Sequence, residues 1–307
     1  MVERVSLAEI RERTYKDRDA WWTVWLVDPL AARLVRLVAP WRAVTPNRLT
    51  VGAFLIGLAA AACFWQQSWG WLAAGAALFH LSFVLDCMDG KIARLNGTGS
   101  VFGAWLDYVF DRLRVLGCTI ALMGGQFART QDLIYLWLGG LVIFLDMFRY
   151  LNALQMSKVK TDMKELLAAG GEKPIFLEET GSVQHPAEQA AVRTGVGRDG
   201  VERPVVDVYG DFRSRFGGFT RLRNRLVSRR IRAHLFSGIE FQMFVFIVGP
   251  LTYAVVPVTI GSAVLLIAFE LLLIYKLWSA TKTFARQRSV QLITQRVTTA
   301  ETAAPRL

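Results

Sequence analysis

Cysteine is scarce in this sequence, with three residues among 307. Cys63, Cys87 and Cys118 lie in or beside apolar stretches without ligand spacing, which excludes a disulfide framework and a cysteine-based metal site. The first twenty residues are densely charged and lack the apolar centre of a signal peptide, so we expect this stretch to stay cytoplasmic. The sequence also lacks an internal repeat.

Long apolar blocks dominate what is present. Hydrophobic residues make up 53% of the sequence. A soluble domain of this length could bury a large core without long apolar blocks, so the pattern indicates a membrane protein. The net charge of +11 would suit nucleic acid, but the basic residues flank the apolar blocks as they do in cytoplasmic loops of membrane proteins. Nucleic acid is therefore excluded as a partner.

The hydropathy pattern predicts an all-α membrane protein with six transmembrane helices preceded by an amphipathic interfacial helix. A helical stripe of apolar residues from Trp21 to Pro40, with a kink at Pro29, predicts the surface helix. Each predicted span is near the ~20 residues that cross ~30 Å of hydrocarbon. The six segments are approximately 49–67, 71–88, 101–124, 132–154, 235–256 and 258–280.

The distribution of basic residues predicts the orientation. Of the 36 Lys and Arg residues, only Arg129 falls in the three loops at 66–70, 124–131 and 250–261. The positive-inside rule then places both termini in the cytoplasm of a multi-pass cell-membrane protein, which we expect to be a bacterial plasma-membrane protein.

These boundaries predict five regions along the chain. We expect residues 1–44 to form the cytoplasmic N-terminus with the surface helix, 45–155 a catalytic core of spans one to four, and 156–232 a partly disordered cytoplasmic insert. Residues 233–284 are predicted as spans five and six, and 285–307 as a flexible tail.

Spans two and three contain carboxylates that helices in lipid ordinarily avoid. In the run LDCMDGKIARLNGTGSVFGAWLDYVFDR, Asp86 and Asp89 are three residues apart, and Asp107 and Asp111 are four apart, so each pair projects from one helix face. The two helices are antiparallel and meet on the cytoplasmic side, which lets the four side chains converge. Divalent cations would relieve their repulsion, and oxygen ligands favour two Mg²⁺ or Mn²⁺ ions, which would clamp a diphosphate.

Neighbouring residues fit a phosphate-bearing substrate. Gly90 and Gly103 leave room for a close approach to the backbone, and Arg94 supplies a planar cationic donor. Asn47, in the segment TPNRLT that begins span one on the same membrane face, is able to bond a headgroup or nucleobase.

The pattern D-x2-D-G-x2-A-R-x8-G-x3-D-x3-D resembles the signature of the CDP-alcohol phosphotransferase family, with every specified position met. The resemblance covers about residues 40–155. It implies metal ligation by Asp86, Asp89, Asp107 and Asp111, with Asp111 also the general base for an acceptor hydroxyl that displaces CMP. It further implies CDP binding by Asn47, Gly90, Ala93, Arg94 and Gly103, six spans, and a homodimer.

Other intramembrane charges have two interpretations each. Arg112 and Arg114 are interpreted as counter-ions of the acidic cluster rather than phosphate contacts. Arg149 either pairs with Asp146 or contacts an anionic acceptor, and Glu240 is a second candidate acceptor contact.

The leading hypothesis is transfer of a phosphatidyl or substituted phosphoryl group, with CDP-diacylglycerol as donor and a small polar alcohol or its phosphate as acceptor, in phospholipid synthesis. A CDP-aminoalcohol donor with diacylglycerol as acceptor is the alternative. An intramembrane prenyltransferase would place its two acidic motifs in distant halves of the chain, whereas these four aspartates lie within residues 86–111. A cation transporter would need midplane carboxylates and repeats.

Overall fold

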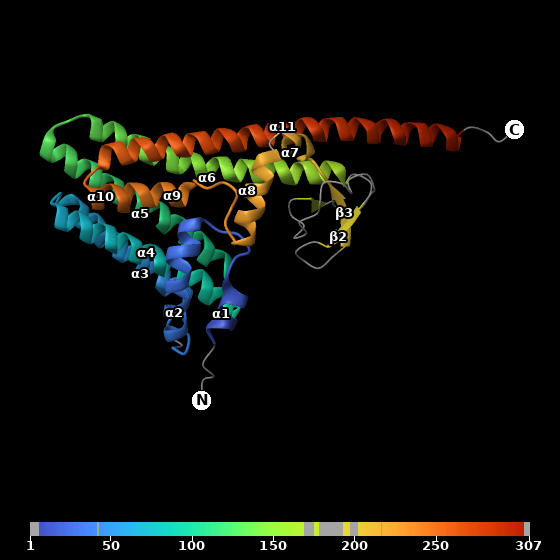
Figure 1. Ribbon diagram of the computed structural model, residues 1–307. Coiled ribbons are helices and arrows are strands. Elements are labelled where there is room, and N and C mark those ends of the chain that lie inside the picture. The colour runs from blue at the N-terminus through green and yellow to red at the C-terminus, as the bar shows by residue number, and fades with distance from the viewer. Residues whose placement is uncertain are drawn as a thin grey trace. The chain divides into compact units, whose positions relative to one another are not determined.

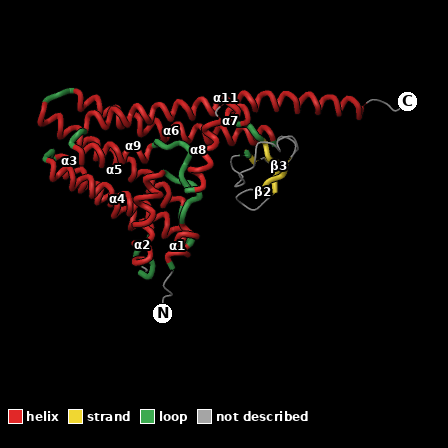
Figure 2. Tube along the Cα trace, in the orientation of Figure 1, coloured by secondary structure: helices red, strands yellow, loops and turns green. Residues whose placement is uncertain are grey.

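The computed structural model describes residues 6–41, 43–168, 175–177, 193–196, 202–215 and 217–303. The chain divides into two compact units, one of residues 1–150 and 226–269, the other of residues 151–225 and 270–307. Helices dominate the described residues, and strands are confined to one small sheet (Figures 1 and 2). The predicted helical fold is thus confirmed except for this sheet.

The first unit begins with two short helical segments. The first is α1 (Leu7–Thr14), whose N-cap Ser6 accepts a hydrogen bond from Glu9 N at 3.1 Å. The predicted surface helix appears as a π-helical turn η1 (Thr23–Val27) that leads into α2 (Asp28–Val38). Pro29 lies in the first turn of α2, where a missing N–H is tolerated, so the chain does not break there.

Helix α2 has two apolar faces. Its buried face, which includes Ala31, Ala32 and Val35, packs against α4 (Trp69–Asn96), while Leu30 and Leu37 are exposed. An exposed apolar face is compatible with the predicted position on a membrane surface, which stays a prediction.

Three long helices form the body of the first unit. Helix α3 (Pro46–Trp65) packs against both α4 and α5 (Val101–Thr130), and α3 and α4 lie side by side in Figure 1. Thr45 caps the start of α3 and Pro46 occupies its first turn, two features that favour a helix beginning here.

An apolar stretch returns to this unit after the insert. It comprises α9 (Gly238–Met243), the π-helical turn η3 (Phe244–Val248) and α10 (Gly249–Thr252), which end at Tyr253 in a left-handed conformation. Two longer helices, α6 (Ile134–Leu167) and α11 (Val255–Ala303), each contribute residues to both units.

The second unit contains the sheet. Strands β1 (Ile175–Phe176), β3 (Glu202–Val206) and β2 (Arg193–Val196) lie in that order, with β1 parallel and β2 antiparallel to β3. Helices α7 (Gly210–Arg215) and α8 (Gly217–Ser228) follow. A small core packs β1 and the residues that follow β3 against α6 and α11, and is made by Met163, Phe176, Val208, Tyr209, Ala280 and Phe284.

Four helices are long and apolar enough to cross a bilayer: Pro46–Trp65, Trp69–Asn96, Ile134–Leu167 and Val255–Arg286. They correspond to predicted spans one, two, four and six. Helix α5 has 30 residues but is more polar, and the apolar helix Gly238–Thr252 is shorter. A membrane protein is therefore supported, whereas six crossings stay a prediction.

Two helices extend beyond the predicted spans. The helix that contains the span expected at 71–88 continues to Asn96, and the one that contains the span expected at 132–154 continues to Leu167, inside the predicted insert. Much of the predicted disorder of the insert falls outside the described residues. The tail is helical through Ala303, so its flexibility stays a prediction.

Candidate functional site

The link between α4 and α5 brings the two acidic pairs to the same end of the helices. Gly97 ends α4 in a left-handed conformation (φ 64°), which favours glycine, and Ser100 caps α5 by accepting a hydrogen bond from Gly103 N at 2.9 Å. Only residues 97–100 separate the helices. The chain therefore turns back directly, with one pair near the end of α4 and the other near the start of α5.

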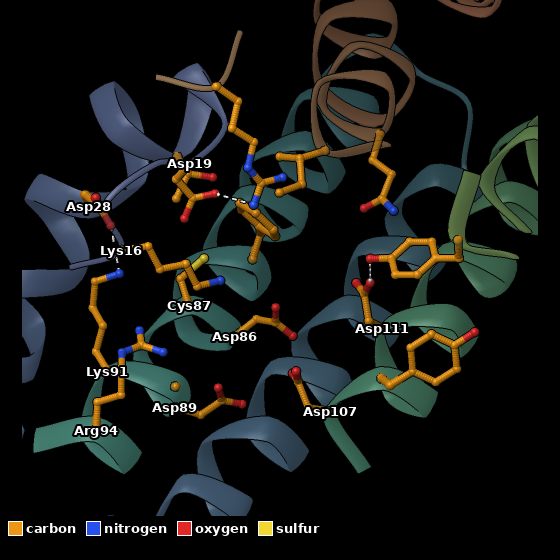
Figure 3. A pocket seen from close by; sticks show the side chains of 18 residues that line it. Lys16, Asp19, Asp28, Asp86, Cys87, Asp89, Lys91, Arg94, Asp107 and Asp111 are labelled. Atoms are coloured by element: carbon orange, nitrogen blue, oxygen red, sulfur yellow. Dashed lines mark hydrogen bonds and ion pairs between the residues drawn. The ribbon is translucent and has the colours of Figure 1, made fainter. Parts of the chain in front are cut away.

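All four signature aspartates line one cavity of about 290 Å³. In Figure 3, Asp86, Asp89 and Asp107 approach one another at its centre, while Asp111 lies to one side. The structure thus brings together the four carboxylates that the sequence pattern singled out.

The four carboxylates have different partners. Asp89 accepts a 2.5 Å hydrogen bond from the hydroxyl of Thr50 on α3, and Asp86 lies 3.4 Å from Arg114. Asp107 has no hydrogen bond or ion pair within the part of the chain that the structure describes. Its oxygens are therefore available to a ligand from the cavity.

Asp111 is the most engaged of the four. Arg114 pairs with its Oδ1 and Arg112 with its Oδ2, and the Tyr150 hydroxyl donates to Oδ2 at 3.3 Å. The predicted role of both arginines as counter-ions is confirmed. A carboxylate held by two guanidinium groups is a weak base, so this conformation does not present Asp111 to an acceptor hydroxyl.

Arg114 is fixed beneath the cavity, where its side chain is 1% exposed. Its Nη1 donates to Ser82 Oγ at 3.1 Å, and it fills the space beside Gly57, where an added Cβ would lie 2.7 Å from its Cγ. A side chain at position 57 of α3 would therefore collide with Arg114 in the position from which it pairs with Asp111 on the same helix, α5.

Arg112 joins a second set of contacts. It pairs with Asp146 of α6 and its guanidinium lies 3.6 Å from the centre of the Tyr150 ring. Asp146 also accepts a 2.8 Å hydrogen bond from Gln242. The structure therefore gives Asp146 partners other than the predicted Arg149.

The carboxylates do not form a ready-made metal centre. Among the described residues, no three His, Cys, Asp or Glu side chains are grouped closely enough to hold an ion. The chemistry of the donor set nevertheless fits a hard divalent cation, because oxygen atoms of Asp86, Asp89 and Asp107 share one cavity. Metal ligation stays a prediction that the donors permit.

The predicted CDP contacts fall into two groups. Gly90 and Arg94 line the cavity, and Arg94 also donates through Nε to Thr14 O at 2.9 Å. Asn47 and Gly103 adjoin each other, since a Cβ on Gly103 would lie 3.0 Å from Asn47 Oδ1. Ala93 is half-buried, and neither it nor the Asn47–Gly103 pair lines this cavity.

The two candidate acceptor contacts lie outside the cavity lining. Glu240 caps its own helix, where its Oε2 accepts bonds from Ser237 N at 2.9 Å and Ser237 Oγ at 2.6 Å. The cap engages one oxygen, whereas Oε1 is buried without a hydrogen-bond partner among the described residues. Arg149 lies beside Gly238, and its acceptor role stays a prediction.

The sequence interpretation missed a wall of the cavity. It comes from the N-terminal segment up to the start of α2, from α4 and α6, and from the end of the predicted insert and α9. It consists of Lys16, Asp19, Thr23, Asp28, Lys91, Tyr150, Arg232 and Gln242. One signal was present: Lys91 occupies a position that the signature leaves unspecified, directly after Gly90.

Charge pairs hold this wall together. Asp28 lies 2.7 Å from Lys91 and 3.1 Å from Arg230, and all but Arg230 are buried. Tyr15 donates to Asp28 O at 3.0 Å, and its ring lies 4.3 Å from the Arg230 guanidinium. Burial, with the negative charge of Asp28, raises the pKa of the Tyr15 phenol, so it stays protonated as the donor of this bond.

Comparisons with known proteins identify the family of this chain. The sequence profile described as CDP-alcohol phosphatidyltransferase matches residues 43–169. The chain is 30% identical to the phosphatidylinositol phosphate synthase of Corynebacterium glutamicum over 60% of its own length and 74% of the relative's. It is 41% identical to the bifunctional IPC transferase and DIPP synthase of Aquifex aeolicus over 22% of its length, but spans only 15% of that protein.

A solved structure was also matched. It is the phosphatidylinositol phosphate synthase of Mycobacterium tuberculosis in complex with manganese and citrate, at 19% identity and a TM-score of 0.33, over 82% of this chain and 89% of that one. This TM-score is too low to establish a common fold.

The cavity lined by the complete acidic signature includes residues of α4 and α6, two helices that are long and apolar enough to cross a bilayer. The chain belongs to the CDP-alcohol phosphatidyltransferase family.

Proposed function

We propose that the protein transfers a phosphatidyl or other substituted phosphoryl group from a CDP-alcohol to an acceptor alcohol, with release of CMP, in phospholipid synthesis. The observation that carries this proposal is that Asp86, Asp89, Asp107 and Asp111 line one cavity. Family membership supports it independently.

Two divalent ions, Mg²⁺ or Mn²⁺, are the proposed cofactors, held by the four aspartates. When bound, they would neutralise the donor's diphosphate and the charge that develops on departing CMP. The CDP moiety would be held by Gly90, Ala93 and Arg94 on α4, together with Asn47 on α3 and Gly103 on α5. Arg94 is suited to phosphate because its guanidinium presents a fixed fork of N–H donors.

The proposed reaction is a single displacement. The acceptor hydroxyl oxygen attacks the β-phosphorus, the bond from this phosphorus to the bridging oxygen breaks, and CMP leaves with that oxygen. The hydroxyl proton passes to Asp111. Because Arg112 and Arg114 pair with both of its oxygens, this role requires Asp111 to release one arginine when substrates bind.

CDP-diacylglycerol is the proposed donor, and a small polar alcohol or its phosphate the acceptor. The name of the corynebacterial relative, a phosphatidylinositol phosphate synthase, supports this direction. The alternative is a CDP-aminoalcohol donor with diacylglycerol as acceptor, since the same diphosphate would bind in the same place. A prenyltransferase is the less favoured alternative, because its two acidic motifs would lie in distant halves of the chain, whereas these four aspartates lie within residues 86–111.

CMP release tests these alternatives directly. Purified protein in lipid nanodiscs is given Mg²⁺ with either CDP-diacylglycerol plus glycerol, glycerol 3-phosphate or inositol 1-phosphate, or CDP-ethanolamine plus diacylglycerol. We expect CMP from the first donor. CMP from the second alone would establish the alternative, and CMP from neither would contradict the proposal. Lipid analysis of cells with and without the gene then identifies the product.

Six crossings with both termini in the cytoplasm complete the proposal, in a homodimer in the bacterial plasma membrane. Helix α5 has 30 residues, about 45 Å at 1.5 Å per residue, and is long enough for a third crossing. Single cysteines at Ser68, Arg129 and Tyr253 should react with a membrane-impermeant maleimide from outside, and one at Gly99 should not. Labelling only of the cysteine at position 99 would show that the protein has the opposite orientation in the membrane. Cross-linking in native membranes tests the dimer, and an absence of cross-linked pairs would contradict it.

A further inference from the structure

Four cationic side chains line the carboxylate cavity, at Lys16, Lys91, Arg94 and Arg232. Two of them are neutralised within the wall, since Lys91 pairs with Asp28 at 2.7 Å and Arg232 with Asp19 at 3.3 Å. Arg94 belongs to the acidic signature's own sequence run. Lys16 therefore remains as a cation of this cavity that the proposed reaction does not use.

The ammonium group of Lys16 has no ion pair or hydrogen bond within the described ranges. In Figure 3 its side chain extends from the N-terminal segment toward the middle of the cavity. An unpaired cation that faces carboxylates without contacting them is placed to bind an anion held between the two.

The backbone at Lys16 is held in place. Its carbonyl oxygen accepts hydrogen bonds from Arg230 Nε at 3.1 Å and Nη2 at 2.9 Å. Three residues on, Asp19 forms a parallel bridge with Ile231, with bonds from Asp19 N to Arg230 O at 2.8 Å and from Arg232 N to Asp19 O at 2.9 Å. The Lys16 side chain thus starts from a fixed point.

A second polar group of the same segment points to a ligand. Thr23 lines the cavity at 2% exposure, and its hydroxyl oxygen is buried without a hydrogen-bond partner in the described structure. Buried hydroxyl groups are normally satisfied, so a partner from the cavity is expected. Thr23 is the first residue of the π-helical turn η1, a feature frequent at functional sites.

We propose that Lys16 and Thr23 form a phosphate-binding subsite that contacts a phosphoryl oxygen of a substrate. The inference rests on the proposed function and deepens it, because it adds contacts from outside the signature. Two substrates would supply this chemistry: the diphosphate of the CDP donor, or the phosphate of a phosphorylated acceptor. The ammonium would pair with the anionic oxygen, and the threonine hydroxyl would donate to it.

Binding measurements separate the two sources without requiring turnover. Wild-type protein and the variants Lys16→Gln, Lys16→Arg and Thr23→Val, in nanodiscs with Mg²⁺, are titrated with CDP and separately with glycerol 3-phosphate and inorganic phosphate. Arg18→Gln is the matched control. It also removes one positive charge, and Arg18 is two residues from Lys16 in the sequence, but its side chain does not line the cavity. Tm measurements show that each variant is folded.

We expect Lys16→Gln to weaken one class of probe by about 10-fold, the scale of a lost charged hydrogen bond. Thr23→Val should weaken the same probe less, and Lys16→Arg should retain most of the affinity. Weaker CDP binding alone assigns the subsite to the donor, and weaker glycerol 3-phosphate or phosphate binding alone assigns it to the acceptor.

Unchanged affinity of Lys16→Gln for every probe would overturn the subsite, as would an equal loss in Arg18→Gln. The CMP assay is a separate test of the proposed function. If the wild-type protein released no CMP, the proposed reaction would be contradicted. If Lys16→Gln nevertheless bound phosphate more weakly than wild type, the subsite would still be supported.

Discussion

Lys91 Nζ lies 2.7 Å from Asp28 Oδ1, and both side chains are buried. The pair joins the signature region of α4 to the first turn of α2, since Lys91 directly follows Gly90. Arg230, near the end of the predicted insert, also contacts Asp28 at 3.1 Å and so joins this pair. The side of the cavity that carries the four signature aspartates and the wall that the sequence did not predict are thus parts of one packed structure.

Replacement of Lys91 should destabilise the protein. Lys91→Met leaves Asp28 buried with only Arg230, and loss of one partner of a buried pair costs about 3–5 kcal/mol, so with Arg230 present we expect a loss of about 2–4 kcal/mol. Thermal unfolding in detergent measures it. The double variant Lys91→Met/Asp28→Asn also removes the unpaired charge. Its loss of stability should be smaller than the sum of the losses of the two single variants. A wild-type Tm for Lys91→Met would show that the pair is not structural.

Asp107→Asn should abolish CMP release and leave the protein folded and inserted. Asp107 lines the cavity without a hydrogen bond or ion pair among the described residues, so its loss removes a proposed ligand and no internal contact. We expect activity to fall by about 100-fold or more. Asp162→Asn, an exposed aspartate on α6, is the control and should keep full activity. Wild-type turnover by Asp107→Asn would refute the ligand assignment.

Two glycines on α3 provide a matched pair. A Cβ at Gly57 would lie 2.7 Å from Arg114 Cγ, whereas one at Gly52 meets nothing within 4 Å. Gly57→Ala should therefore displace Arg114 from its packed position and lower the Tm. Gly52→Ala should keep activity and gain up to about 1 kcal/mol of stability, because alanine favours helix. Equal behaviour of the two variants would contradict the packing of Arg114.

Metal removal should stop the reaction. After chelation with EDTA and gel filtration we expect no CMP release, with recovery on addition of Mg²⁺ or Mn²⁺. Since a bound ion stabilises the folded state, Mn²⁺ should also raise the Tm of wild-type protein and raise it less in Asp107→Asn. Full activity after exhaustive chelation would exclude a metal-dependent mechanism.

The acidic half of the site was predictable from the sequence. The spacing of Asp86, Asp89, Asp107 and Asp111 on two helices, joined by a short link, determines that the side chains meet. The counter-ion role of Arg112 and Arg114 followed from their position after Asp111. These are local relationships, set by helical geometry over a few turns.

The missed half depends on contacts between residues distant in the chain. Asp28 contacts both Lys91 and Arg230, and Asp19 pairs with Ile231 across more than two hundred residues. Periodicity carries no information about such pairs. The full lengths of α4 and α6 were also not predicted, because hydropathy indicates where a helix leaves lipid and not where the helix ends.

The α-helical phase of α5 from its first residue, Val101, onward makes the site sensitive to insertions as well as to substitutions. One residue inserted inside α5 ahead of Asp107 would turn the side chains that follow by roughly 100° about the helix axis, since each residue advances a helix by that angle. Asp107 and Asp111 would then face away from Asp86 and Asp89, although no side chain had been altered. Substitutions at Thr98 or Gly99, in the link before α5, should be tolerated, while a one-residue insertion inside α5 ahead of Asp107 should inactivate the enzyme.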